Sequence, residues 1–263
     1  MVNIRDFNTK AIILKKYKVA ENDLSFLMLT EKFGKINIWM KGARKIFQKQ
    51  KFGTYLDLFS LLEIGLYKYK SRSTENERNL LKNIKTLEYN YDIRLNFEKF
   101  ELANFFLQTV NKMTILNTGK EVFALLNESL VLLDKCDANN LDYLKYIFLL
   151  NLSTTLGYKF ELDKCTNCGL LVPDQIKRIV FSFGDGGILC NVCKQKRLKD
   201  NTYYHDFFQI NKDLFFLLKK FYKLDVFDNN FFKYFNDKDK SVMNTEAFNI
   251  FFDKVMKNLI NLS

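Results

Sequence analysis

Four of the five cysteines in this sequence form two Cys-x-x-Cys pairs. Cys165 and Cys168 make the first pair, Cys190 and Cys193 make the second, and 21 residues separate the pairs. Two such pairs let four thiolates converge tetrahedrally on Zn²⁺ from two tight turns, and four thiolates leave no coordination position open for a reacting water. The pattern therefore predicts one structural zinc ion held by these four cysteines.

Other uses of the cysteines are less favoured. Disulfides are disfavoured in a cytosolic chain, and a thioredoxin-like redox site uses a single Cys-x-x-Cys in a βαβ unit. The fifth cysteine, Cys136, falls near the end of a predicted helix and is interpreted as a small buried apolar residue. The single histidine, His205, is interpreted as an ordinary surface or core residue rather than a metal ligand.

A second candidate site is the basic segment GKINIWMKGARKIFQKQKF, residues 34–52. It carries six Lys or Arg residues, no Asp or Glu, and the only tryptophan of the chain, Trp39. Residues 1–90 hold 18 Lys or Arg against 9 Asp or Glu, so they account for +9 of the net charge of +11. A basic surface concentrated in one third of a chain favours a polyanionic partner such as nucleic acid.

The segment begins with a predicted strand, residues 35–41, in which apolar and polar residues alternate. Ile36, Ile38 and Met40 would face the core, and Trp39 would stand on the opposite face between Lys35 and Lys41. An aromatic ring among cations suits single-stranded nucleic acid, whose bases stack and whose phosphates pair with cations. The alternative is that a neighbouring domain packs over this face and buries Trp39. The predicted nucleic-acid contacts are Lys35, Trp39, Lys41, Arg44, Lys45, Lys49 and Lys51.

The elements that position these residues fall into two classes. Short runs rich in β-branched, aromatic and leucine residues predict strands near the N-terminus, at residues 11–19, 23–30, 35–41, 55–64 and 81–89. Five short strands without a long helix between them indicate a small barrel. From residue 92 apolar residues recur at helical spacing, which predicts three helices ending near Gly157, and further helices over 211–223 and 245–260.

The predicted fold class is α+β. The expected domains are a five-stranded barrel over residues 1–90, a helical domain over 91–160, the four-cysteine insert over 161–200 and the rest of the helical domain over 201–263. We expect the aromatic stripes of the helices to form core rather than a cofactor pocket.

Several classes of protein are disfavoured by what the sequence lacks. It has no GxxxxGK[ST] loop for a nucleoside triphosphate, and a single histidine makes a catalytic triad with Ser or Cys improbable. No stretch approaches the ~20 apolar residues of a membrane-spanning helix, and the N-terminus has no signal-peptide core. We therefore expect a cytoplasmic binding protein without enzymatic activity and without a membrane partner.

Taken in order, the motifs resemble the bacterial recombination-mediator family RecO. The resemblance rests on AIILKKYKVAENDLSFLMLT, on EKFGKINIWMKGARK with its KGAR element (residues 41–44), and on LGYKFELDKCTNCG and FSFGDGGILCNVC around the cysteine pairs. It implies an N-terminal OB-fold barrel followed by a helical domain that carries a zinc finger. It also implies DNA contacts at Lys41 and Arg44 and metal ligation by the four paired cysteines.

The resemblance further implies an activity and partners. Members of the family bind single- and double-stranded DNA, anneal complementary strands, and act with RecR to help RecA load onto DNA coated by single-strand-binding protein, whose C-terminal tail they bind. This chain would then be cytoplasmic and associated with the nucleoid. Two rival hypotheses stay open at this point, a zinc-containing RNA-binding protein of translation or ribosome assembly, and a zinc enzyme acting on nucleic acid.

Overall fold

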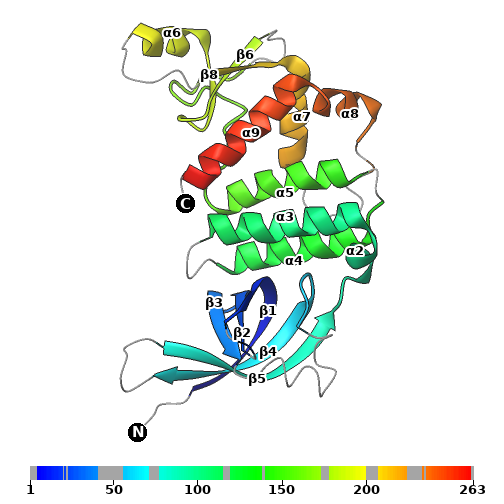
Figure 1. Ribbon diagram of the computed structural model, residues 1–263. Coiled ribbons are helices and arrows are strands. Elements are labelled where there is room, and N and C mark those ends of the chain that lie inside the picture. Colours follow the sequence, from blue (N-terminus) through cyan, green and yellow to red (C-terminus); the bar gives the residue numbers. More distant parts are fainter. Residues whose placement is uncertain are drawn as a thin grey trace. The chain divides into compact units, whose positions relative to one another are not determined.

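The chain forms two compact units, residues Met1–Leu141 and Asp142–Ser263. The computed structural model, drawn in Figure 1, describes residues 5–19, 21, 23–40, 56–70, 77–114, 119–137, 140–172, 178–199, 207–223, 233 and 235–261. The first unit contains a barrel and the helices that follow it, and the second contains a small sheet and the remaining helices. The finer domain boundaries expected at residues 90, 160 and 200 stay predictions.

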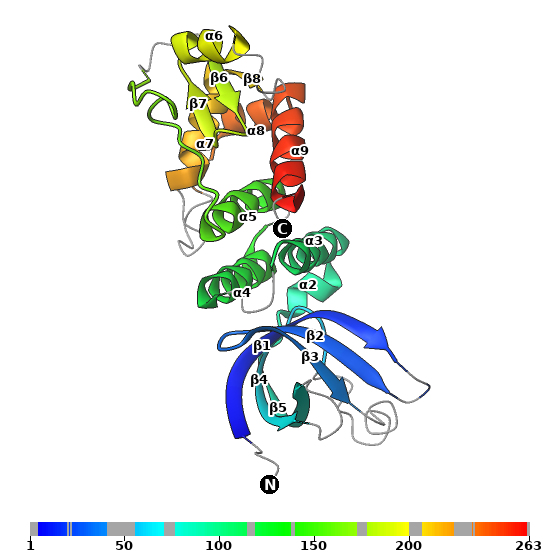
Figure 2. The same cartoon turned by 90° about the vertical axis from the view of Figure 1, so that its left-hand side faces the viewer.

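Among the described residues, five strands close into a barrel in the first unit. Around the barrel their order is β1-β2-β3-β5-β4, with β4 paired back to β1; β3 and β5 run parallel and the other pairs are antiparallel. The barrel confirms the predicted OB-fold class, and Figure 2 shows β1, β2 and β3 side by side. The strands are β1 (Arg5–Lys18), β2 (Leu24–Thr30), β3 (Gly34–Met40), β4 (Leu61–Lys70) and β5 (Glu77–Glu88).

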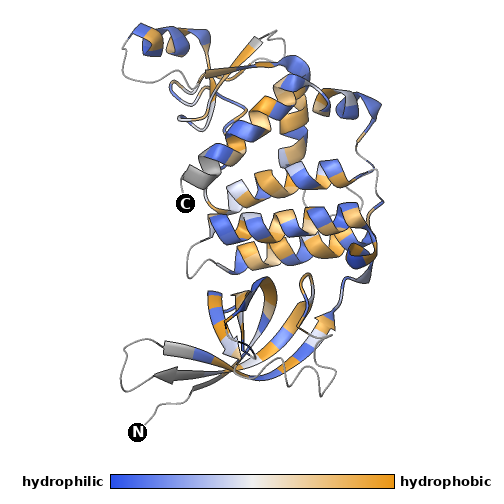
Figure 3. Ribbon diagram, viewed as in Figure 1, coloured by the Kyte–Doolittle hydropathy of each residue, from blue (hydrophilic) through white to orange (hydrophobic). Residues whose placement is uncertain are grey.

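Alternation along the strands builds the barrel core. Ile38 of β3 is fully buried among the side chains of β1, β2 and β4, and its neighbours Ile36 and Met40 pack against the same cluster. The residues between them face outward, as expected from the period of two. Figure 3 shows hydrophobic and hydrophilic residues alternating along the barrel strands.

Two strand boundaries differ from the sequence prediction. The strand expected over 55–64 is β4, which begins only at Leu61. The fifth strand, β5, begins at Glu77 rather than at residue 81. Phe59 precedes β4 with a left-handed φ of 68° and a buried side chain, so the apolar run turns before it pairs. Residue periodicity does not register a backbone turn of this kind, so the sequence alone does not mark where pairing begins.

Helices α2 (Tyr91–Leu95), α3 (Phe97–Met113) and α4 (Lys120–Lys135) complete the first unit. The side chain of Asn96 caps α3 by accepting a hydrogen bond from the Lys99 N–H at 3.0 Å. Phe106, Leu107 and Val110, at helical spacing, are buried. These helices confirm the predicted change of period after the barrel.

Arg94 of α2 joins the helices to the barrel. Its guanidinium donates to the carbonyl oxygen of Asn90 at 2.7 Å and to the Ser60 hydroxyl at 2.9 Å, and it also donates to the carbonyl oxygens of Leu58 and Tyr89. A planar group with five donors can satisfy several backbone acceptors at once. The Arg94 side chain therefore links α2 to the residues that precede β4 and to those that follow β5.

The second unit is less loop-rich than the sequence indicates. Within the expected insert, β6 (Arg178–Ser182), β7 (Gly187–Leu189) and α6 (Asn191–Lys199) form regular structure, and β8 (Phe207–Asn211) adds a third strand to the sheet in the order β7-β6-β8. Strands of three to five residues are too short to show a periodic pattern. The helices of this unit are α5 (Leu141–Thr155), α7 (Lys212–Lys223), α8 (Asp237–Met243) and α9 (Glu246–Asn261).

The aromatic residues of the second unit form its core. The Phe181 ring lies 5.1 Å from the Phe160 ring and 5.1 Å from the Phe251 ring, both in edge-to-face geometry. Phe181 and Phe251 are fully buried. The stripes are therefore packing surfaces, as expected. Within the described ranges, no helix combines the length and the apolar character needed to cross a membrane.

Candidate nucleic-acid surface and candidate metal centre

Trp39 lies on the outer face of the barrel. The two alternatives for this ring were exposure and burial under a neighbouring domain, and its exposed fraction in the structure is 39%. Because Ile38 points into the core, the pleat of β3 turns Trp39 outward. More than a third of the Trp39 surface is thus accessible to solvent.

Lys35, on the same outer face of β3, makes contacts within the protein. Its ammonium donates to the carbonyl oxygens of Asn111 at 2.8 Å and Thr114 at 2.6 Å, at the C-terminal end of α3. The last carbonyls of a helix lack intrahelical partners, and a cation placed there also interacts favourably with the helix dipole. Burial lowers the pKa of this ammonium. Contact between Lys35 and nucleic acid stays a prediction, and the structure adds a capping role.

We expect Lys35→Met to reduce the free energy of unfolding by about 1–2 kcal/mol, because the α3 carbonyls lose a charged donor. Urea unfolding of the full chain measures this change. Lys85→Met is the control, since it removes the same charge from an exposed position on β5. An unfolding free energy equal to that of the control would contradict the capping role, and a salt slope of DNA binding reduced by about 0.7 would show a phosphate contact as well.

The five remaining predicted cations, Lys41, Arg44, Lys45, Lys49 and Lys51, lie outside the described residues. These five cations follow Met40, the last residue of β3, which comes directly after Trp39. It returns at Asp57, whose carboxylate contacts Lys16 of β1 at 2.9 Å and Arg94 at 3.5 Å. Burial opposes ionisation of Asp57, but its hydrogen bond to Lys16 and the two positive charges lower its pKa. The described residues on either side of positions 41–55 therefore both belong to the barrel unit.

Sequence reasoning missed Tyr17. The strand register pairs Tyr17 of β1 with Ser25 of β2, and Ser25 with Trp39 of β3. Directly opposed residues share one face of a sheet, so Tyr17 and Trp39 both lie on the outer face with Ser25 between them. A β-bulge between Ile13 and Lys15 shifts the phase of β1. Simple alternation from the buried Ile13 would have placed Tyr17 inside the barrel.

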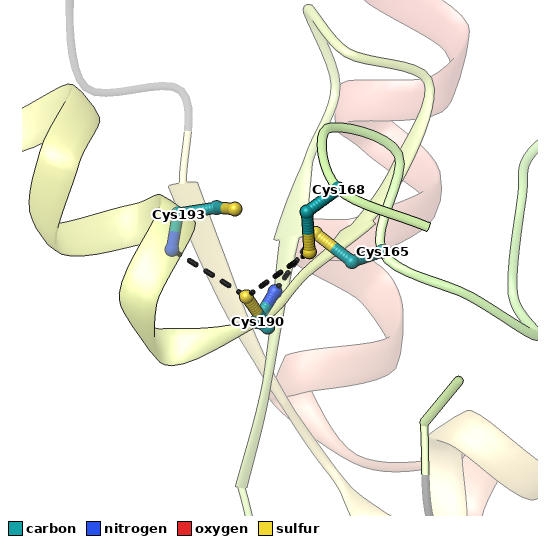
Figure 4. A group of neighbouring side chains, drawn as sticks. All are labelled: Cys165, Cys168, Cys190 and Cys193. Carbon is teal, nitrogen blue, oxygen red and sulfur yellow. Dashed lines mark hydrogen bonds between the residues drawn. The ribbon is translucent and has the colours of Figure 1, made fainter. Parts of the chain in front are cut away.

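The four paired cysteines come together in the second unit, as Figure 4 shows. Their sulfur atoms all lie within 4.8 Å of one another. The Sγ atoms of Cys168 and Cys190, from different pairs, are 3.7 Å apart. Cys165 and Cys193 are buried, whereas Cys168 is exposed. The cluster predicted from sequence spacing is confirmed, and it could hold a metal ion.

Hydrogen bonds to sulfur support the cluster. The Cys190 N–H donates to Cys165 Sγ at 3.3 Å, the Cys193 N–H donates to Cys190 Sγ at 3.4 Å, and the Asn167 amide donates to Cys193 Sγ at 3.3 Å. Donors of this kind stabilise thiolates and orient metal ligands. The turns thus supply the outer contacts that a cation-binding thiolate cluster requires.

These contacts change the acidity of the first pair. Burial opposes ionisation of Cys165, but backbone N–H groups, that of Cys190 first, outweigh it and lower its pKa to about 6. A backbone N–H at Leu170 favours the Cys168 thiolate, yet hydrogen bonds to the other sulfurs raise the pKa of Cys168 to about 11. Within the first pair, the Cys165 thiol is therefore the more acidic of the two.

Glycines make the two cysteine turns possible. Gly169 follows the first pair with φ of 73°. Gly187 precedes the second pair and bridges to Glu161, where a Cβ atom would collide with the Glu161 carbonyl oxygen. The Ile188 N–H donates to that same carbonyl at 3.0 Å. The close approach of these backbones brings the two pairs to one point.

A hollow of about 750 Å³ lies beside the four-cysteine cluster, and Cys165 is part of its lining. Phe160, Phe183 and Val255 supply its apolar wall, and its charged lining is mixed, with Lys159 and Lys164 beside Glu161 and Asp185. Most of its lining comes from residues 157–169 and 183–186, so it is built largely by the four-cysteine insert. An apolar wall of this kind suits a ligand with apolar side chains.

Comparison with known proteins gives one consistent family. Residues 3–84 match the family model described as Recombination protein O N terminal, and residues 94–205 match Recombination protein O C terminal. The chain is 30% identical to the DNA repair protein RecO of Acetivibrio thermocellus over 186 residues, which cover 70% of this chain and 69% of that protein. It is also 30% identical to the RecO protein of Dehalococcoides mccartyi strain CBDB1 over 208 residues, covering 75% of this chain and 74% of the relative. The chain therefore belongs to the RecO family of DNA repair proteins.

Proposed function

We propose that this protein is a recombination mediator that binds single- and double-stranded DNA, anneals complementary strands, and acts with RecR to help RecA load onto DNA covered by single-strand-binding protein. One observation carries the DNA-binding part of the proposal. Strand β3 presents Trp39 on the outer face of the barrel and leads directly into a segment with five cations and no acidic residue. Family membership supports the rest.

Annealing follows from electrostatics without bond-making chemistry. Two DNA strands repel each other through their phosphates, and a basic surface that neutralises phosphates on both lowers that repulsion. The residues proposed for this role are Lys41, Arg44, Lys45, Lys49 and Lys51, with Lys35 and Trp39 on the strand before them. Such a protein needs no catalytic residues.

We further propose that the ion held by the four cysteines is zinc, with a structural role. Zinc–sulfur bonds of about 2.3 Å in a tetrahedron place the sulfurs about 3.8 Å apart. The distance of 3.7 Å between Cys168 and Cys190 fits this value. Zinc would join the two turns into one unit, and four thiolate ligands would leave it no catalytic position.

The proposed receptor for the acidic, apolar tail of single-strand-binding protein is the hollow beside the metal centre. Phe160 and Phe183, whose rings are 6.3 Å apart, would receive apolar side chains. Lys159 and Lys164 would pair with carboxylates of the tail. The contacts with RecR and RecA are proposed from the family alone.

Strand annealing tests the proposed function. We expect the full chain to accelerate annealing of complementary oligonucleotides, both bare and coated with single-strand-binding protein, as followed by fluorescence energy transfer. Coating with a tail-less single-strand-binding protein is the control. The annealing rate on strands coated in this way should fall towards the rate measured without the protein. Absence of acceleration on bare strands would contradict the mediator role. Tighter binding to RNA than to DNA of the same sequence would favour the RNA-binding alternative.

A further inference from the structure

We propose that Tyr17 and Trp39 form a two-ring platform on the outer face of the barrel that stacks on the bases of an unpaired strand. This inference rests on the proposed DNA-binding function and specifies which form of nucleic acid this surface selects. It adds Tyr17, which lies outside the basic segment, to the contact surface.

The strand register places the two rings on one face. Tyr17 lies opposite Ser25, and Ser25 lies opposite Trp39, so the rings stand two strands apart with a small side chain between them. Their exposed fractions are similar, 38% for Tyr17 and 39% for Trp39. Neighbouring strands are about 4.8 Å apart, which separates the two ring positions by about 10 Å.

The surroundings of the rings suit a polyanionic strand. The ammonium of Lys15 lies 4.8 Å from the centre of the Tyr17 ring, and Lys15 is exposed. A phosphate attached to a base stacked on Tyr17 would meet this cation. On the other side of Trp39, the parallel pairing of Ile38 with Asn79 brings Leu80 next to it, and Leu80 is 41% exposed. The track of accessible apolar side chains thus crosses the strands and is flanked by positive charge.

The separation of the rings selects unpaired strands. Bases in a duplex are stacked at about 3.4 Å per step, so their faces are not accessible to rings about 10 Å apart. A single strand can unstack and offer two base faces at that separation. Stacking uses the faces of the bases and leaves the pairing edges free. A strand held in this way can still pair with its complement, which annealing requires.

The test compares Tyr17→Ala with Tyr17→Phe and with Tyr91→Ala, an exposed tyrosine on α2 away from the platform. The probes are oligo-dT, an abasic strand of equal length and a duplex of equal length, titrated with the full chain. We expect Tyr17→Ala to weaken binding to oligo-dT by about 5- to 150-fold, the range for loss of one stacked base. Binding to the abasic strand and to the duplex should stay unchanged, and Tyr17→Phe should retain wild-type affinity.

Equal losses on oligo-dT and the abasic strand, or no loss on oligo-dT, would overturn the platform. If Tyr17→Ala does not fold, photocrosslinking of the unsubstituted protein to a 5-iodouracil oligonucleotide decides the question, with crosslinks expected at Tyr17 and Trp39. Crosslinks confined to other residues would overturn it too. Loss of binding on charge reversal of Lys41 and Arg44, with no effect of Tyr17→Ala, would reject the platform and leave the DNA-binding function intact.

Discussion

Replacing Lys41 and Arg44 together with Glu is expected to weaken binding to single-stranded DNA by about 70-fold at 50 mM salt. Each phosphate contact on a single strand contributes roughly 0.7 to the slope of log affinity against log salt. Loss of two contacts lowers the slope by about 1.4, which corresponds to about 70-fold between 1 M and 50 mM salt. Repulsion by the new carboxylates adds to the loss. Anisotropy titrations at several salt concentrations measure both the affinity and the slope.

The loss should be the same for unrelated DNA sequences, since phosphates are common to all of them, and annealing should fail with it. The control is Lys112→Glu with Lys257→Glu, which changes the net charge equally at exposed positions on α3 and α9. If the variant with Glu at 41 and 44 is folded and keeps wild-type affinity and slope, the basic segment is a solvated surface and the proposed contact is wrong.

Changing Cys190 to Ser should release the bound ion and lower the melting temperature by roughly 10 °C or more. Zinc binding in small domains is worth about 10–16 kcal/mol, whereas a typical hydrogen bond contributes about 1 kcal/mol. The parent protein should contain about one zinc per chain, as expected for one closed four-thiolate site. Metal analysis and calorimetry measure these quantities. DNA affinity should change much less, because the proposed contacts lie on the barrel.

Cys136→Ser is the matched control for the metal site. Cys136 is buried and its thiol donates to the Leu133 carbonyl at 3.4 Å, outside the cluster. Burial raises the pKa of Cys136 to about 11, and this thiol is not among the four clustered sulfurs. The control should keep its zinc. Absence of zinc from protein purified without chelator, with all four clustered thiols freely reactive, would rule out the site.

Local sequence patterns by themselves predicted the cysteine cluster, the faces of β3 and the first long helices. The spacing within and between the Cys-x-x-Cys pairs predicts the cluster because each pair needs only its own tight turn, and Gly169 stands where the first turn requires it. The faces of β3 follow from alternation around Ile38, because a regular strand has a strict period of two. The helical period predicts α3 and α4 for the same reason.

Only the tertiary structure decided the features that depend on distant partners or on broken periodicity. Lys35 donates to the carbonyl oxygen of Asn111 at the end of α3, and these two residues are 76 positions apart in the sequence. No local pattern predicts that contact. Tyr17 reaches the outer face because a bulge opposite Met28 and Leu27 inserts one residue into β1, and an inserted residue reverses the inside and outside of every position after it. A bulge arises from pairing between strands, so the platform of Tyr17 and Trp39 exists only once the barrel has closed.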